Sequence, residues 1–142
     1  MNIFPFFSEE STPVLGRGLP LMREVARDPN TGKTVWRGGS PVIVSGVEAV
    51  ASWAMAALRT VRCRHDIYST QFGCDAMTLM GRAWSEDVKS VEAPRMVRDA
   101  LTASPYVTGV DDLTVEFADG RLVISGRLNT IYGEVRLDVS DL

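Results

Sequence analysis

The residues best suited to chemistry gather in one segment, RTVRCRHDIYSTQFGCD, which covers residues 59–75. It holds three arginines, the only histidine and both cysteines of the chain, together with Tyr68 and Phe72. Thiols beside an imidazole could form a nucleophilic pair or part of a metal site, whereas arginine and aromatic side chains favour binding to another protein. A connection that only turns the chain uses Gly, Pro, Asn or Ser. We therefore expect this segment to bind a partner.

Catalysis has little support in the sequence. A nucleophilic triad needs a base, and the one histidine, His65, lies between Arg64 and Asp66 in a strongly polar stretch. We expect its imidazole to be exposed and to have no catalytic role. The glycine pairs at residues 16–18 and 38–39 lack the strand-to-helix context and the lysine of a phosphate loop. The sequence predicts no catalytic residues and no enzyme.

The acidic residues do not form the pair that a glycosidase needs, in which one carboxylic acid lies in an apolar pocket. Each has a simpler place, in a helix cap, on a solvated strand or turn, or at a helix start. Glu48 lies in the helix cap. Glu116, Asp119 and Glu134 lie on a solvated strand or turn, and Glu86, Asp87 and Glu92 lie at a helix start.

Cys63 and Cys74 are the only cysteines. With His65 they give three potential zinc ligands, but structural zinc sites almost always have four, and no fourth is evident. We predict no metal and no cofactor. In a cytoplasm two reduced thiols are expected. A disulfide between them is the alternative if the finished protein leaves the cell.

Composition fits one globular domain that does not bind nucleic acid. The chain has 142 residues, 45% hydrophobic and 23% charged, and a net charge of −3. That balance gives no basic surface for nucleic acid. No run of eighteen apolar residues could cross a membrane, and the first residues lack the features of a signal peptide. We expect the protein to be made and folded in a cytoplasm.

The first half of the chain predicts an arm, a hairpin and a helix. Residues 1–20 form an extended arm with Phe4, Phe6 and Phe7, which either fold back on the domain or dock on a partner, and prolines and glycines up to residue 20 exclude regular structure. Residues 21–26 and 34–37 form a hairpin with a longer loop. A capping box of Ser45 and Glu48 then starts a helix that ends near residue 59 or 60. Its buried stripe is Val47, Val50, Ala51, Ala54, Leu58 and Val61, with Trp53 also in the core.

The second half predicts a short helix, a second long helix and a meander. One or two helical turns span residues 75–80, a polar linker follows over residues 84–90, and a helix runs from Val91 or Pro94 to Ala103, with Met96, Val97, Ala100 and Leu101 buried. Three alternating strands close the chain, with a type I′ turn at Asp119–Gly120. The predicted fold is α+β: a small mixed or antiparallel sheet with a C-terminal three-strand meander and two main helices packed on it. Residues 21–142 form this single domain.

Several short motifs follow one another in the order typical of one protein family. They lie at residues 46–50 (Gly-Val-Glu-Ala-Val), 67–69 (Ile-Tyr-Ser), 72–75 (Phe-Gly-Cys-Asp), 100–101 (Ala-Leu), 107–111 (Val-Thr-Gly-Val-Asp) and 129–134 (Asn-Thr-Ile-Tyr-Gly-Glu). In this order and spacing, residues 21–139 resemble the sheath-initiator, or baseplate wedge, proteins of contractile phage tails, a family often labelled lysozyme-like. The nearest branch is the prophage type. A more distant branch has Pro-Gly-Glu-Arg where this chain has residues 61–64.

The resemblance implies a structural protein of the virion tail baseplate, assembled in the host cytoplasm, that starts sheath polymerisation. The implied partners are the tail sheath protein and baseplate wedge proteins, with tail tube or hub proteins as a further option, and neither nucleic acid nor membrane. The wedge-facing residues would be Arg59, Arg62, Arg64, Tyr68 and Phe72, and the strand that accepts sheath strands would carry Glu134, Arg136 and Asp138. Two alternatives stay open, a regulatory module of the same fold that captures a host factor, and a cell-wall hydrolase.

Overall fold

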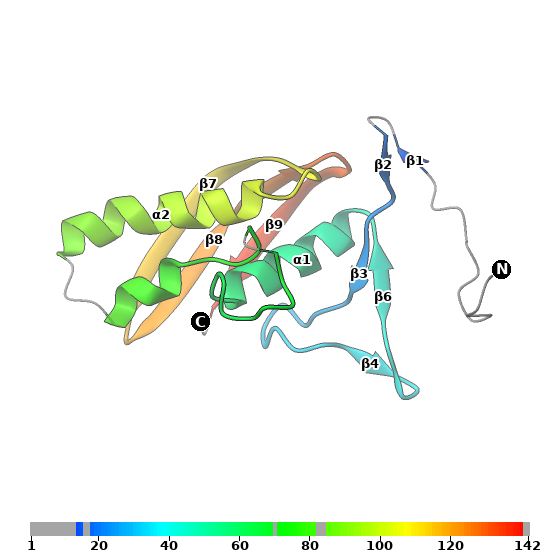
Figure 1. Ribbon diagram of the computed structural model, residues 1–142, viewed down its shortest axis with the longest axis horizontal. Helices are drawn as coiled ribbons and strands as arrows, with labels where there is room; N and C mark the ends of the chain where they lie inside the picture. The colour runs from blue at the N-terminus through cyan, green and yellow to red at the C-terminus, as the bar shows by residue number, and fades with distance from the viewer. Residues whose placement is uncertain (1–13, 16–17, 70, 82–84, 141–142) are drawn as a thin grey trace.

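The computed structural model of the protein describes residues 14–15, 18–69, 71–81 and 85–140 (Figure 1). These residues form short N-terminal strands, two long helices with a 3₁₀ helix between them, and a C-terminal sheet. The elements are β1 (Val14–Leu15), β2 (Leu19–Pro20), β3 (Arg23–Val25), β4 (Trp36–Arg37), β5 (Ser40–Pro41), β6 (Ile43–Ser45), α1 (Val47–Arg59), η1 (Ala76–Gly81), α2 (Glu86–Thr102), β7 (Val107–Ala118), β8 (Arg121–Thr130) and β9 (Gly133–Val139). The predicted α+β fold is confirmed.

The C-terminal sheet is the predicted antiparallel meander, with strand order β7-β8-β9. Asp119 and Gly120 join β7 to β8 with φ values of 50° and 73°, the left-handed values that a two-residue type I′ turn requires. Across the strands Val115 lies opposite Ile124, and Ile124 lies opposite Val139. A row of apolar side chains therefore crosses all three strands on one face.

Both long helices cover this apolar face, α1 over β9 and α2 over β7 (Figure 1). Because side chains alternate between the two faces of a strand, the opposite face of the meander carries polar residues such as Ser125 and Arg127. The core lies between the helices and the sheet. Its largest fully buried side chains are Leu58, Leu79, Leu101, Leu122, Ile124, Leu128, Val50, Val97, Val139 and Cys74.

Helix α1 begins one residue later than a Ser45 cap implies, and the predicted capping box is wrong. The N-cap is Gly46, and no side chain bonds to the helix start there. Gly46 has φ 67° and ψ −136°, a backbone conformation that glycine adopts without the steric cost of a Cβ atom. Ser45 still belongs to β6, where it pairs with Arg23, so it lies one residue too early to cap the helix.

Helix α2 begins earlier than predicted, so the expected linker over residues 84–90 and the start at Val91 or Pro94 are wrong. The Ser85 hydroxyl accepts a hydrogen bond from the Val88 amide at 3.3 Å, and Glu86 and Asp87 occupy the first turn. Acidic residues there are stabilised by the helix dipole. These start signals outweigh the cost of Pro94, which lies inside the helix and removes one backbone donor.

The predicted hairpin near the N-terminus is only partly right. Its loop closes as expected, since the Asp28 amide donates to the Lys33 carbonyl at 2.9 Å and the Val35 amide to the Ala26 carbonyl at 2.9 Å. Strand β3, however, pairs with β6 and not with residues 34–37. The short β4–β5 hairpin returns the chain, so β6 runs beside β3, and both strands contact α1.

Part of the expected arm has regular structure, so the prediction that prolines and glycines exclude it there is wrong. Strand β1 pairs antiparallel with β2, and the Tyr106 hydroxyl donates to the carbonyl of Pro20 at 2.7 Å. The three phenylalanines at positions 4, 6 and 7 and Trp84 lie outside the described residues. The division into an arm of residues 1–20 and a domain of residues 21–142 stays a prediction.

Candidate protein-binding surfaces

The arginine-rich connection, described over residues 61–69 and 71–73, folds as a closed loop that we call the Ω-loop. Its ends meet where the Cys74 amide donates to the Thr60 carbonyl at 2.8 Å. Gly73 makes this closure fit: its φ is +111°, and a Cβ atom there would lie 2.8 Å from the Thr60 carbonyl oxygen and 2.9 Å from the Arg62 main chain. The loop is therefore held by its own backbone, and most of its described side chains, residues 63–69 and 71, are exposed.

A series of aromatic rings runs from the core to the surface of the Ω-loop. Phe72 meets Trp53 of α1 edge to face, with ring centroids 6.3 Å apart, and meets Tyr68 at 4.6 Å. Tyr68 in turn meets His65 at 6.1 Å. Phe72 and Trp53 are half-buried, whereas Tyr68 is 47% exposed and Ile67 is 85% exposed. Aromatic rings anchored in this way lose little conformational entropy when they bind a partner.

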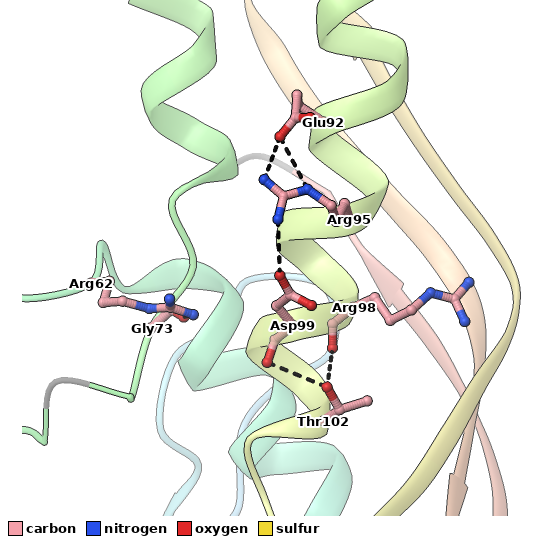
Figure 2. A network of polar contacts seen from close by, with 7 residues as sticks. All are labelled: Arg62, Gly73, Glu92, Arg95, Arg98, Asp99 and Thr102. Atoms are coloured by element: carbon pink, nitrogen blue, oxygen red, sulfur yellow. Dashed lines mark hydrogen bonds and ion pairs between the residues drawn. The ribbon is translucent and has the colours of Figure 1, made fainter.

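The three arginines of the segment have three different roles. The Arg59 guanidinium turns away from the Ω-loop and donates from Nη2 to the Ser140 carbonyl at 3.0 Å, just beyond β9. Arg62 is half-buried, and its Nη2 donates to the Gly73 carbonyl at 3.5 Å; both residues are drawn in Figure 2. Arg64 is exposed. Of the three, Arg64 is the one most open to a partner.

The reactive groups of the segment do not assemble into a catalytic or metal site. His65 and Cys63 are exposed, whereas Cys74 is buried, and no disulfide joins the two thiols. Burial raises the pKa of the Cys74 thiol, and the charge of Asp75 adds to that effect, so this thiol is a poor nucleophile. Among the described residues, no three His, Cys, Asp or Glu side chains are grouped so that they could hold a metal ion.

The second predicted surface, on β9, is made of exposed charges. Glu134, Arg136 and Asp138 all point to the polar face of the meander. Arg136 bonds Asp138 at 2.8 Å along the strand, and Glu134 lies 3.8 Å from Arg127 of β8. Exposed ion pairs of this kind contribute little to stability. The exposed side chains of β9 are therefore paired among themselves and with Arg127.

The two edges of the meander differ in how open they are. Strand β7 has two register shifts against β8, and the Arg98 guanidinium of α2 donates to the Val110 carbonyl at 3.1 Å. Strand β9 pairs with β8 without a shift over seven residue pairs, and no strand in the described part of the chain pairs with its other side. Bulges and covering side chains are common ways of closing an edge. By this criterion β7 is closed and β9 is open.

The same helix that closes β7 carries three further charges on a separate surface. Glu92, Arg95 and Asp99 form a ladder along α2, with Arg95 Nε 3.1 Å from Glu92 and Arg95 Nη1 3.6 Å from Asp99. Figure 2 shows this ladder on one side of the helix while the Arg98 side chain extends away from it on the other. Arg98 is thus committed to β7, and the ladder is ordinary helix-surface pairing.

A groove of about 380 Å³ follows the open edge of β9. One wall is four successive β9 residues, 135–138, and the other includes Ala26 and Val44, beside β3 and in β6. The floor is a stripe of α1 at helical spacing, made of Glu48, Ala51, Ser52 and Met55. An i, i+3, i+4, i+7 stripe forms one face of a helix. This face of α1 extends past β9 toward the β3–β6 pair.

The predicted site residues therefore fall into two regions. The structure brings Tyr68 and Phe72 together in the Ω-loop, and it brings Glu134, Arg136 and Asp138 together on β9. Arg59 belongs to neither surface. It is the last residue of α1, it precedes the Ω-loop in the chain, and its guanidinium donates to the Ser140 carbonyl just beyond β9.

Sequence reasoning missed two features of these surfaces. Ile67 is the most exposed large apolar side chain among the described residues, and its place beside Tyr68 in a charged loop was a usable signal. The floor of the groove was missed because Ala51 was assigned to the core stripe. Small residues at positions 51 and 52, one turn after Glu48, were the available sign of a face that another chain could approach.

Comparison with known proteins then assigns the family. The family model described as "Contractile injection system sheath initiator" matches residues 23–133, which include α1, the Ω-loop, α2 and most of the meander. The chain belongs to the contractile injection system sheath initiators. It is also 25% identical over 97 residues to the phage-like element PBSX protein XkdS of Bacillus subtilis (strain 168), an alignment that covers 68% of this chain and 69% of that protein.

Membership gives this sheath initiator a coarse function. It is a structural component of a contractile injection system, located at the tail baseplate, and the family implies contact with tail sheath components. Within the described residues, no helix is both long and apolar enough to cross a membrane.

Proposed function

We propose that this sheath initiator links wedge proteins of the baseplate to the sheath and starts sheath polymerisation by accepting a sheath strand on the open edge of β9. The observation that carries the proposal is the contrast between the two edges of the meander. An edge strand with unpaired main-chain groups is a template for another strand. In an antiparallel ladder, alternate residues of such a strand direct their N–H and C=O groups away from the sheet.

The main chain supplies affinity in this mode of binding, and side chains supply selection. Strand β9 fits that division because its exposed charges at positions 134, 136 and 138 are satisfied by one another and by Arg127. The C-terminal end of β9 is also anchored, because the Arg59 guanidinium donates a hydrogen bond to the Ser140 carbonyl just beyond it. An incoming strand would meet an edge that is already fixed in place.

The Ω-loop is the proposed wedge-facing surface. Ile67 and Tyr68 provide exposed apolar area, and Arg64 provides an exposed charge. Beside them a hollow of about 260 Å³ is lined by Met22, Trp53, Phe72 and Tyr106 together with residues of the 103–105 turn. An apolar side chain from a wedge protein would fill this hollow while Tyr68 and Arg64 contact its surroundings, the usual anatomy of a binding hot spot.

Proline at Arg136 tests the β9 assignment directly. Arg136→Pro removes one main-chain donor and leaves the edge without regular pairing there, so baseplates that contain it should fail to start sheaths. Arg136→Ala keeps the amide and loses only the side chain, so it should start sheaths of normal length. Purified baseplates mixed with sheath protein would be scored by electron microscopy, after thermal unfolding has shown that each variant is folded. Normal sheaths from folded Arg136→Pro would contradict the role of this strand.

A further inference from the structure

We infer that the strand paired with β9 lies in the groove over α1 and carries small side chains at the alternate positions that face Ala51. This inference rests on the proposed function and adds what kind of strand the sheath must supply. The occupant is an extended segment of the tail sheath protein, neutral overall and with residues such as Gly, Ala or Ser on its inward face.

The position of the groove decides where such a strand must lie. A strand added to a sheet lies about 4.7–4.9 Å from its neighbour, and the space beside residues 135–138 is bounded by α1 below and by Ala26 and Val44 on the far side. Figure 1 shows α1 between the meander and the β3–β6 pair. The added strand would thus lie across α1, between β9 and the N-terminal strands.

The floor of the groove sets the size of the inward side chains. Met55 and Ser52 are buried, with 6% and 5% exposure, so Ala51 is the half-buried floor residue that an incoming side chain would meet. An alanine floor closed by a second wall leaves room for short side chains. Long ones would need the wall of Ala26 and Val44 to move, and packed surfaces resist such shifts.

The charges around the groove favour a neutral occupant. Its lining includes two cations, Arg27 and Arg136, and two carboxylates, Glu48 and Asp138, so their formal charges cancel. Arg136 and Asp138 already bond one another at 2.8 Å, and Arg27 donates to the Gly32 carbonyl at 3.2 Å. A strongly charged segment would find no surplus of opposite charge in this groove, so the groove favours a neutral strand over a charged one.

The test is a substitution that adds side-chain volume at the floor of the groove. Ala51→Leu keeps helix propensity and adds volume where the strand would lie, while Ala51→Ser changes the chemistry with almost no change in size. Isolated baseplates carrying each variant would be mixed with purified sheath protein, and the fraction that bears sheath would be counted. We expect Ala51→Leu to lower that fraction at least about tenfold and Ala51→Ser to leave it unchanged. Ala26→Leu makes the same test from the opposite wall if Ala51→Leu does not fold.

The outcomes separate this inference from the proposed function. If a folded groove-filling variant starts sheaths normally while Arg136→Pro does not, the edge is the acceptor and the groove inference is wrong. If neither variant affects sheath formation, both are wrong. Loss of sheath formation with Ala51→Leu and with Arg136→Pro, but not with Ala51→Ser, supports both the groove inference and the proposed function.

Discussion

The Ω-loop presents side chains to a partner, whereas the β9 edge presents its main chain. In the Ω-loop the backbone is closed on itself by the hydrogen bond from the Cys74 amide to the Thr60 carbonyl, and exposed side chains such as Ile67 and Tyr68 face outward. On β9 the exposed side chains are paired with one another, and the main chain of the outer edge has no partner strand in the described residues. In the proposed function, one surface selects a partner by side-chain shape, and the other accepts a strand through its backbone.

This difference makes the two surfaces respond to different mutations. Side-chain truncation should weaken binding at the Ω-loop and leave the β9 edge almost unaffected. Loss of a main-chain donor should have the reverse pattern. Because Arg59 precedes the Ω-loop in the chain and bonds the end of β9 but lies on neither surface, it is a poor residue for telling them apart.

The largest effect on the Ω-loop should come from Gly73→Ala. A methyl group would lie 2.8–2.9 Å from main-chain atoms of Thr60 and Arg62, at a φ of +111°, so the loop could not close without shifting. We expect a loss of about 2 kcal/mol or more in the free energy of unfolding, measured by urea titration, because strained left-handed conformations cost about 1–3 kcal/mol before any clash is counted. A variant as stable as the parent would show that the loop is not held by this closure.

A smaller effect, on binding alone, should come from truncating the Ω-loop side chains. Arg64→Ala combined with Tyr68→Ala should weaken binding to wedge proteins by about 1–3 kcal/mol, the range for an interface anchor, and should leave sheath binding unchanged. Copurification of wedge proteins from a lysate with the tagged variant measures the first, and the electron-microscopy assay measures the second. Arg95→Ala, on the ladder of α2, is the matched control. Undiminished copurification of wedge proteins with the double variant would place the wedge contact elsewhere.

The smallest effect should come from the closed edge. Arg98→Ala removes the donor to the Val110 carbonyl and should cost about 0.5–1.5 kcal/mol of stability, as for an ordinary hydrogen bond. Sheath formation should not change, because the register shifts of β7 remain. If this variant stopped sheaths from starting, the assignment of β9 and not β7 as the acceptor would have to be reversed.

Sequence patterns predicted the elements that depend on local signals. The alternation in residues 113–139, the Asp119–Gly120 turn and the apolar stripe of α1 each depend on neighbours a few residues away, so the meander and the first helix were found. The residues of the Ω-loop were found for the same reason, since their unusual chemistry is contiguous in sequence.

The features that were not predicted depend on contacts between distant segments or on local signals that oppose one another. Pairing of β3 with β6 requires the β4–β5 hairpin to return the chain, and the hairpin rule favours nearer partners. The start of α2 at Glu86 requires the Ser85 cap to outweigh Pro94, a balance of two local terms that the pattern alone did not settle. The groove is formed by three segments from both halves of the chain, so no single stretch of sequence indicates it.

The most direct test of the central claim is the structure of the assembled baseplate with its first ring of sheath subunits, determined by cryo-electron microscopy. We expect a sheath strand hydrogen-bonded to the outer edge of β9, over Ala51 and with small side chains facing α1, while the Ω-loop contacts wedge proteins. A sheath ring that touches this protein through side chains alone, with the β9 edge left unpaired, would contradict it.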